Sequence, residues 1–144
     1  MKRVFVILTL VLITKDAVCQ VQKEIDSLVS LINYSPLKLR LTITPDTISM
    51  LSKCFKEDYF VNESGKPAKV RSLNCGTVSS LTNYYFFNKR LIKVESGINK
   101  GDSILNKSEY YFRNGRSVSD NKKEKNIHSY YLGKARSLLD TFKN

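Results

Sequence analysis

The sequence predicts an α+β fold, in which an antiparallel β-meander of repeated hairpins is flanked by N- and C-terminal helices. Three observations predict it. An aromatic-rich segment occurs three times, and each copy is followed by Asn and a return segment. One apolar stripe at helical spacing precedes these segments, and a second follows them. The length of 144 residues suits a single domain.

The first 19 residues are typical of a secretory signal peptide. Two basic residues precede an apolar run at 4–13, which is shorter than the roughly 20 residues needed to cross a bilayer. Ala17 and Cys19 occupy the −3 and −1 positions of a cleavage site, so residues 20–144 form the mature domain. Alternatively, Cys19 is lipidated and anchors a lipoprotein. We therefore expect export, periplasmic or secreted, and no transmembrane segment in the mature chain.

The elements before the repeats follow from their periodicity. Residues 37–44 (LKLRLTIT) alternate and predict a strand. Thr44-Pro45-Asp46 predicts a short helix to about Lys53, because Pro is favoured at the first helical position. The preceding helix ends before Pro36, and its apolar stripe comprises Val21, Ile25, Leu28 and Ile32.

The repeated segments predict three hairpins, at about 57–73, 82–96 and 108–120. Aromatic and β-branched residues favour strands, whereas Asn and Gly tolerate the positive φ of tight hairpin turns. The regular interval suggests duplication of one unit. Its aligned pairs, 26 residues apart, are Tyr59-Phe60, Tyr85-Phe86 and Tyr111-Phe112, each with an Asn two residues further on.

The third unit, YYFRNGR at Tyr110–Arg116, resembles the YYF-x-N-G-[KR] hairpins of small exported bacterial proteins of unknown function. The resemblance extends over about 20–144 and implies a helix at each end, but it does not imply any catalytic residue. The first unit inserts Glu63-Ser64, and the second has Lys89 in place of Gly. A fainter likeness to MORN-type hairpin repeats lacks their Trp and regular Gly positions.

The C-terminal stripe predicts a helix that covers the apolar face of the sheet. Asn121 is a suitable N-cap with Glu124 three residues later, although Gly133 costs the helix about 1 kcal/mol relative to Ala. Alternation along the strands leaves one apolar face to be covered, in a sheet of six or seven strands. The stripe comprises Ile127, Tyr131, Ala135, Leu138 and Phe142.

Two cysteines remain in the mature chain, and we expect them to form a disulfide, as is usual in exported proteins. If the first turn centres on Ser64-Gly65, the numbers of facing residues sum to 129, and those of Cys54 and Cys75 do so. The bond would clamp the open end of that hairpin, although a bulge near Pro67 would change the register.

The residues offer little for catalysis. His128 is the single histidine, and we interpret it as a surface residue of the C-terminal helix. We expect no catalytic set, no cofactor and no metal site, since one histidine and two cysteines supply too few zinc ligands. The alternative is a small exported hydrolase in which His128 acts as the base.

Basic residues dominate the charge. The chain has 24 basic and 13 acidic residues, and the mature part carries a net charge of +9. We predict that Lys69, Arg71, Arg90, Lys93 and Arg116, in or near the turns and return strands, contact an anionic partner. The competing interpretation is a solvated sheet face that discourages edge pairing.

These observations favour a non-enzymatic exported protein that binds a macromolecular partner through its sheet or turns. The partner is a protein or an anionic envelope surface, and we do not expect specific nucleic-acid binding because no motif for it is present. A second alternative is a structural component of the cell envelope.

Overall fold

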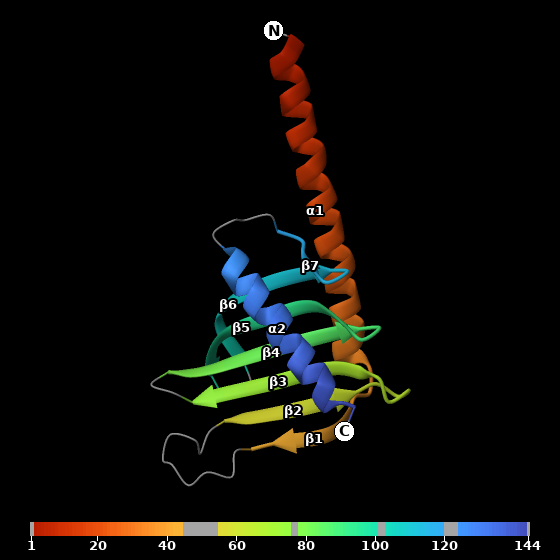
Figure 1. Ribbon diagram of the computed structural model, residues 1–144, viewed down its shortest axis with the longest axis vertical. Helices are drawn as coiled ribbons and strands as arrows, with labels where there is room; N and C mark the ends of the chain where they lie inside the picture. Colours follow the sequence, from red (N-terminus) through yellow and green to blue (C-terminus); the bar gives the residue numbers. More distant parts are fainter. Residues whose placement is uncertain (1, 45–54, 76–77, 101–102, 120–123, 144) are drawn as a thin grey trace.

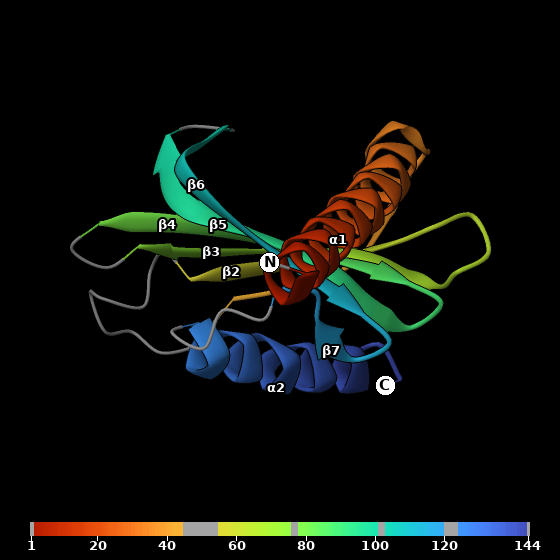
Figure 2. The same cartoon turned by 90° about the horizontal axis from the view of Figure 1, so that it is seen from above.

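The computed structural model describes residues 2–44, 55–75, 78–100, 103–119 and 124–143, and it shows a sheet between two helices (Figures 1 and 2). The elements are α1 (Lys2–Tyr34), β1 (Lys38–Ile43), β2 (Lys56–Val61), β3 (Pro67–Cys75), β4 (Ser79–Phe87), β5 (Arg90–Lys100), β6 (Ser103–Arg113), β7 (Arg116–Ser117) and α2 (Lys125–Thr141). The strands lie in sequence order in one antiparallel seven-stranded sheet. The predicted meander with flanking helices is confirmed.

The helices cover opposite faces of the sheet, which corrects the expectation of a single apolar face (Figure 2). Because both faces are covered, the consecutive β4 residues Tyr84, Tyr85 and Phe86 are all buried. The core under α2 comprises Tyr59, Val61, Val70, Tyr84, Phe86, Leu91, Val94, Phe112, Ala135, Leu138 and Phe142. The core under α1 comprises Ile25, Val29, Tyr85 and Ile92.

The turns of the β2–β3, β4–β5 and β6–β7 hairpins lie at one end of the sheet, called here the turn end (Figure 1). The second and third turns are two-residue loops in which Asn88, Lys89, Asn114 and Gly115 all have positive φ, as type I′ turns require. The first turn is longer, and its Gly65 has a φ of +71°. The insertion in the first unit therefore produces a wider turn.

Residues 26 positions apart in the sequence are aligned across the sheet only between the second and third units. Across the sheet, Tyr85 is aligned through Lys93 with Tyr111, and these residues lie on the α1 face. Tyr59 is instead aligned through Val70 with Tyr84, so it lies on the α2 face. Between the first and second units, the aligned residues are 25 positions apart rather than 26. The side chains of the first unit therefore face the opposite side of the sheet from the equivalent side chains of the other two units.

The first hairpin has the predicted register. From Lys56 to Phe60, paired residue numbers sum to 129, and the bulge near Pro67 affects only the part beside the turn. Cys75 is partly buried, and its Sγ lies 3.7 Å from the hydroxyl of Ser79. Cys54 lies outside the described residues, so the disulfide stays a prediction.

Most of the helical predictions are confirmed. The N-terminal stripe packs on the sheet, and α1 continues without interruption through residues 19 and 20. In the second helix Ile127 is exposed, and His128 occupies the buried position instead. The N-cap is Glu124; Asn121 and the short helix expected at 46–53 lie outside the described residues. None of the described helices is apolar over a length that could cross a membrane.

Candidate functional site

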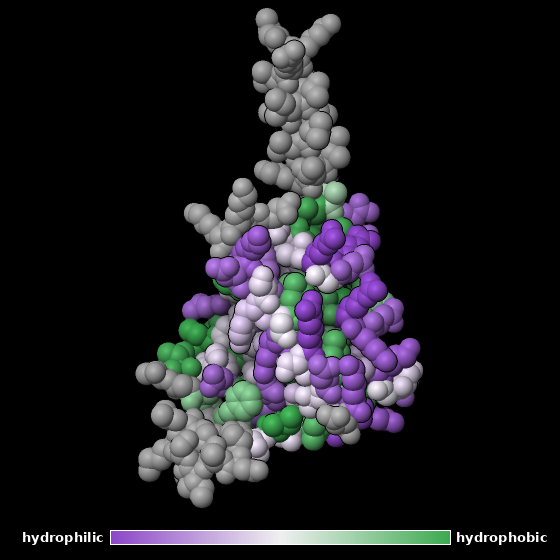
Figure 3. All heavy atoms as spheres, viewed as in Figure 1, coloured by the Kyte–Doolittle hydropathy of each residue, from purple (hydrophilic) through white to green (hydrophobic). Residues whose placement is uncertain are grey.

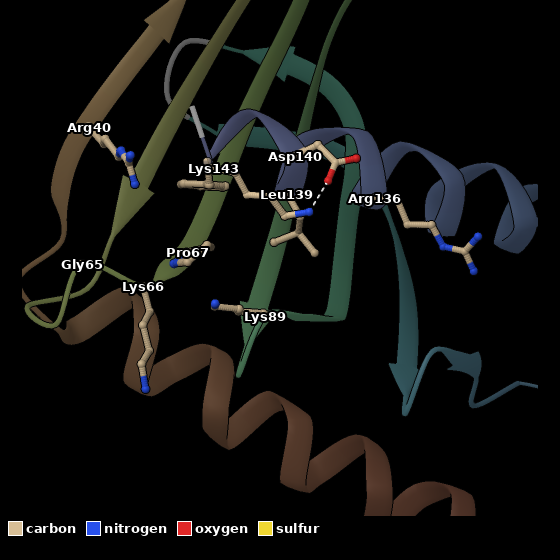
Figure 4. A pocket seen from close by; sticks show the side chains of 10 residues that line it. Arg40, Gly65, Lys66, Pro67, Lys89, Arg136, Leu139, Asp140 and Lys143 are labelled. Atoms are coloured by element: carbon tan, nitrogen blue, oxygen red, sulfur yellow. Dashed lines mark hydrogen bonds and ion pairs between the residues drawn. The ribbon is translucent and has the colours of Figure 1, made fainter.

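A cavity of about 570 Å³ opens at the turn end between β1, the first two hairpin turns and the end of α2 (Figure 4). Five of its side chains are cationic and only one is a carboxylate. In Figure 4, Lys66 extends from the first turn toward α1, and Arg136 extends outward from α2. The lining residues are Arg40, Gly65, Lys66, Pro67, Lys89, Arg136, Leu139, Asp140, Phe142 and Lys143.

Local structure explains why these residues meet. The first two turns lie at the same end of the meander, which brings Lys66 and Lys89 to the turn end. Helix α2 crosses the sheet toward the same end and places Arg136 and Lys143 at its C-terminal part (Figure 1). Between the charges, Pro67, Leu139 and the buried Phe142 provide apolar surface.

The positive charge of this cavity is not neutralised by the described residues. Lys143 forms an ion pair with Asp140 at 2.6 Å. For Arg40, Lys66, Lys89 and Arg136, no carboxylate in the described part of the chain lies within ion-pair distance. Hydrophilic side chains gather over this end of the molecule (Figure 3). The lining of the cavity therefore carries a net positive charge.

A second cavity of about 320 Å³ extends the first one toward the third hairpin. The two share Lys89, Arg136 and Leu139 as lining residues. The second adds Arg90, whose guanidinium donates a hydrogen bond of 2.9 Å to the side-chain oxygen of Asn114. We call the six cations along both cavities the basic groove: Arg40, Lys66, Lys89, Arg90, Arg136 and Lys143.

Lys93, one of the predicted anion contacts, is in fact buried beneath α1. Only 4% of the residue is exposed. Its Nζ lies 2.7 Å from an oxygen of Asp26, 2.9 Å from Glu109 and 3.2 Å from Glu95. It also lies 4.9 Å from the centre of the Tyr111 ring. Its charge is used inside the protein, so it cannot contact a partner.

Lys93, its acidic neighbours, Lys107 and Tyr111 form a group that is buried at Lys93 and more exposed at Asp26 and Lys107. We call it the Lys93 cluster: Asp26, Lys93, Glu95, Lys107, Glu109 and Tyr111. Although burial opposes the charged form, the hydrogen bonds that Lys93 donates to Asp26 and Glu109 raise its pKa. Burial would raise the pKa of Glu109, but Lys107 and Lys93 lower it to about 2. Asp26 belongs to α1, so the cluster fastens that helix to the sheet.

The other predicted contacts are divided between two regions. Lys69 lies under α1, where it donates a hydrogen bond of 3.1 Å to Asn33, and burial lowers its pKa. Arg71 is partly buried in the same strand, and Arg116 is exposed beside the third turn. Of the five, only Arg90 lines the basic groove.

The sequence contains a weak signal for the residues of the basic groove that were not predicted as anion contacts. The substitution of Lys89 for the expected Gly marks the second turn as unusual. Arg136, Asp140 and Lys143 recur at helical spacing near the end of α2. Nothing in the local pattern connects Arg40 of β1 to that helix.

His128 is buried, which corrects its assignment to the helix surface. It is 6% exposed and packs edge-to-face against Tyr110 and Phe112, with ring centroids 5.8 and 6.0 Å apart. Its Nε2 lies 3.4 Å from Glu124. Neither cavity of the basic groove is lined by His128.

Metal-ligating side chains are also not clustered in the described part of the chain, where no group of His, Cys, Asp and Glu could hold an ion. No family, curated protein or solved structure matches this chain.

Proposed function

We propose that this protein is a non-enzymatic exported binding protein, which holds an anionic macromolecular partner in the basic groove. The main support is the collection of unneutralised cations around an open cavity. Four separate elements contribute them: β1, two hairpin turns and α2. A groove of this kind raises the local concentration of an anionic ligand and orients it.

The backbone of Lys89 supports the same proposal. It has a φ of +59°, a conformation that costs most L-residues roughly 1–2 kcal/mol. The corresponding position of the third turn is Gly115, which adopts positive φ without that cost. A strained residue at a cavity is an expected feature of a functional site. Lys89 contributes a cation to the groove where glycine would favour the turn.

The buried ionisable groups support binding rather than catalysis, because each one joins a helix to another part of the fold. Glu57 accepts a hydrogen bond of 2.8 Å from the Tyr59 hydroxyl and forms an ion pair of 2.9 Å with Lys134 of α2. Lys93 joins α1 to the sheet, and His128 of α2 packs against Tyr110 and Phe112 of β6. These structural contacts leave none of the three facing the groove.

Charge reversal in the groove tests the proposal. The double variant Arg40→Glu/Lys89→Glu should lose at least tenfold in affinity for a heparin column or for poly-L-glutamate near physiological salt, where exposed charges are screened beyond about 8 Å. The matched control is Lys23→Glu/Lys125→Glu, which reverses two exposed cations outside the groove. It should lose less than twofold. Equal losses in the two variants would show that the charge serves only general attraction.

A further inference from the structure

Strand β1 forms an edge of the sheet beside the basic groove. In the described part of the sheet its only strand neighbour is β2, so its outer edge has no strand partner. Five of its six residues are exposed, including Leu39 and Leu41. A free strand edge presents a row of backbone donors and acceptors that can pair with another extended chain.

The charges on β1 favour an acidic strand as its pairing partner. Lys38 and Arg40 are exposed, and neither has a carboxylate partner among the described residues. Two copies of β1 side by side would bring four cations together, which disfavours self-association. An acidic strand would instead find complementary charge, and Arg40 also lines the groove.

The register defines where an incoming strand would lie. Lys38 pairs with Val61, the last residue of β2, so this end of β1 is next to the first turn and Lys66. Lys38 shares the α2 face with Val61, and Arg40 lines a cavity on that face. Leu39, opposite Phe60, lies on the other face, and the bulge between Leu39 and Leu41 returns Leu41, opposite Tyr59, to the α2 face. On the α2 face, acidic side chains of an added strand therefore match β1 near Lys38 and Arg40, and apolar side chains match it near Leu41 and Ile43.

We propose that the anionic partner is an extended acidic segment of a protein, which adds to the sheet as a further strand along β1. This inference rests on the proposed function and specifies its ligand. Backbone pairing supplies affinity, and alternate side chains supply specificity. Carboxylates on one face of the added strand contact Lys38, Arg40 and the groove, and apolar side chains on the other face contact Leu39. An acidic polysaccharide offers the charge without the backbone ladder.

A ten-residue peptide of alternating Glu and Val is a suitable probe, compared with the same peptide N-methylated on its backbone. The two have equal charge, but the second cannot donate hydrogen bonds to β1. At physiological salt the unmodified peptide should bind, and it should slow amide exchange in residues 38–43, measured by mass spectrometry. N-methylation should weaken binding at least tenfold, as measured by fluorescence anisotropy.

The outcomes separate this inference from the function on which it rests. Equal binding of both peptides, or unchanged exchange in 38–43, overturns strand addition. If binding of heparin still depends on Arg40 and Lys89 in that case, the groove remains an anion site and the partner is a polysaccharide. If neither the peptide nor heparin depends on those residues, both proposals are wrong. In the comparison of the two peptides only the ligand changes, so misfolding of a protein variant cannot produce that difference.

Discussion

The Lys93 cluster and the basic groove use the same kind of side chain in opposite ways. Beneath α1, two lysines meet three carboxylates, and Lys93 is almost wholly buried. At the turn end, six cations line two cavities, and among described residues the only ion pair there joins Lys143 to Asp140. The buried charge is matched because an unpaired ion inside a protein is costly, whereas exposed cations are hydrated.

This difference shows that the net charge of the protein has two components. One stabilises the fold and is invisible to a partner. The other adds little to stability and is available for binding. The following variants are expected to separate the two, beginning with the largest effect.

Lys93→Met should cause the largest loss of stability. The substitution keeps an unbranched apolar side chain but leaves Asp26, Glu95 and Glu109 close together, with only Lys107 as a counter-charge. Breaking a buried ion pair from one side typically costs about 3–5 kcal/mol. Urea unfolding should show this decrease. Lys107→Met, at the exposed side of the cluster, should cost less than about 1 kcal/mol, and similar losses would contradict the division between buried and exposed charge.

The pH dependence of stability should depend on Glu109. Its pKa in the folded protein is about 2, below the value of roughly 4.3 expected in the unfolded chain. A lowered folded-state pKa means that the stabilisation is complete above pH 4.3 and is lost as the pH falls through 2. Glu109→Gln should therefore be less stable than the wild type at pH 6, with a difference that disappears near pH 2.

The control for that experiment is Glu63→Gln, at an exposed position of the first turn without an ion pair among the described residues. Unfolding in urea at a series of pH values should show almost no change in this variant. A difference between wild type and Glu109→Gln that stays constant from pH 6 to pH 2 would exclude the proposed linkage.

Lys89→Gly should have the smallest effect on stability and the opposite sign. Glycine relieves the positive φ at this position, so the variant should be more stable by up to about 1 kcal/mol, seen as a rise in Tm. The same variant should bind an acidic probe more weakly. Gly115→Lys is the reciprocal change in the third turn and should lower Tm. A Lys89→Gly variant with unchanged affinity would remove Lys89 from the groove's function.

The sequence by itself was sufficient for the elements and their order. Aromatic and β-branched runs with Asn at the reversals determined the hairpins, and the register of the first one followed from its turn. Helical spacing identified both helices. These features depend on neighbours a few residues apart, which local sequence specifies.

Tertiary structure decided which charges are buried and which are grouped. Lys93 differs from Lys89 because α1 covers the face of the sheet on which Lys93 lies. The helix brings Asp26 against Lys93, although the two residues are 67 positions apart in the sequence. Arg40 lines the same cavity as Lys143 because α2 packs on the other face of the sheet and its C-terminal end lies near β1 (Figure 1). A local pattern determines which side of a strand a residue occupies, but the environment of that side depends on distant segments that pack against it.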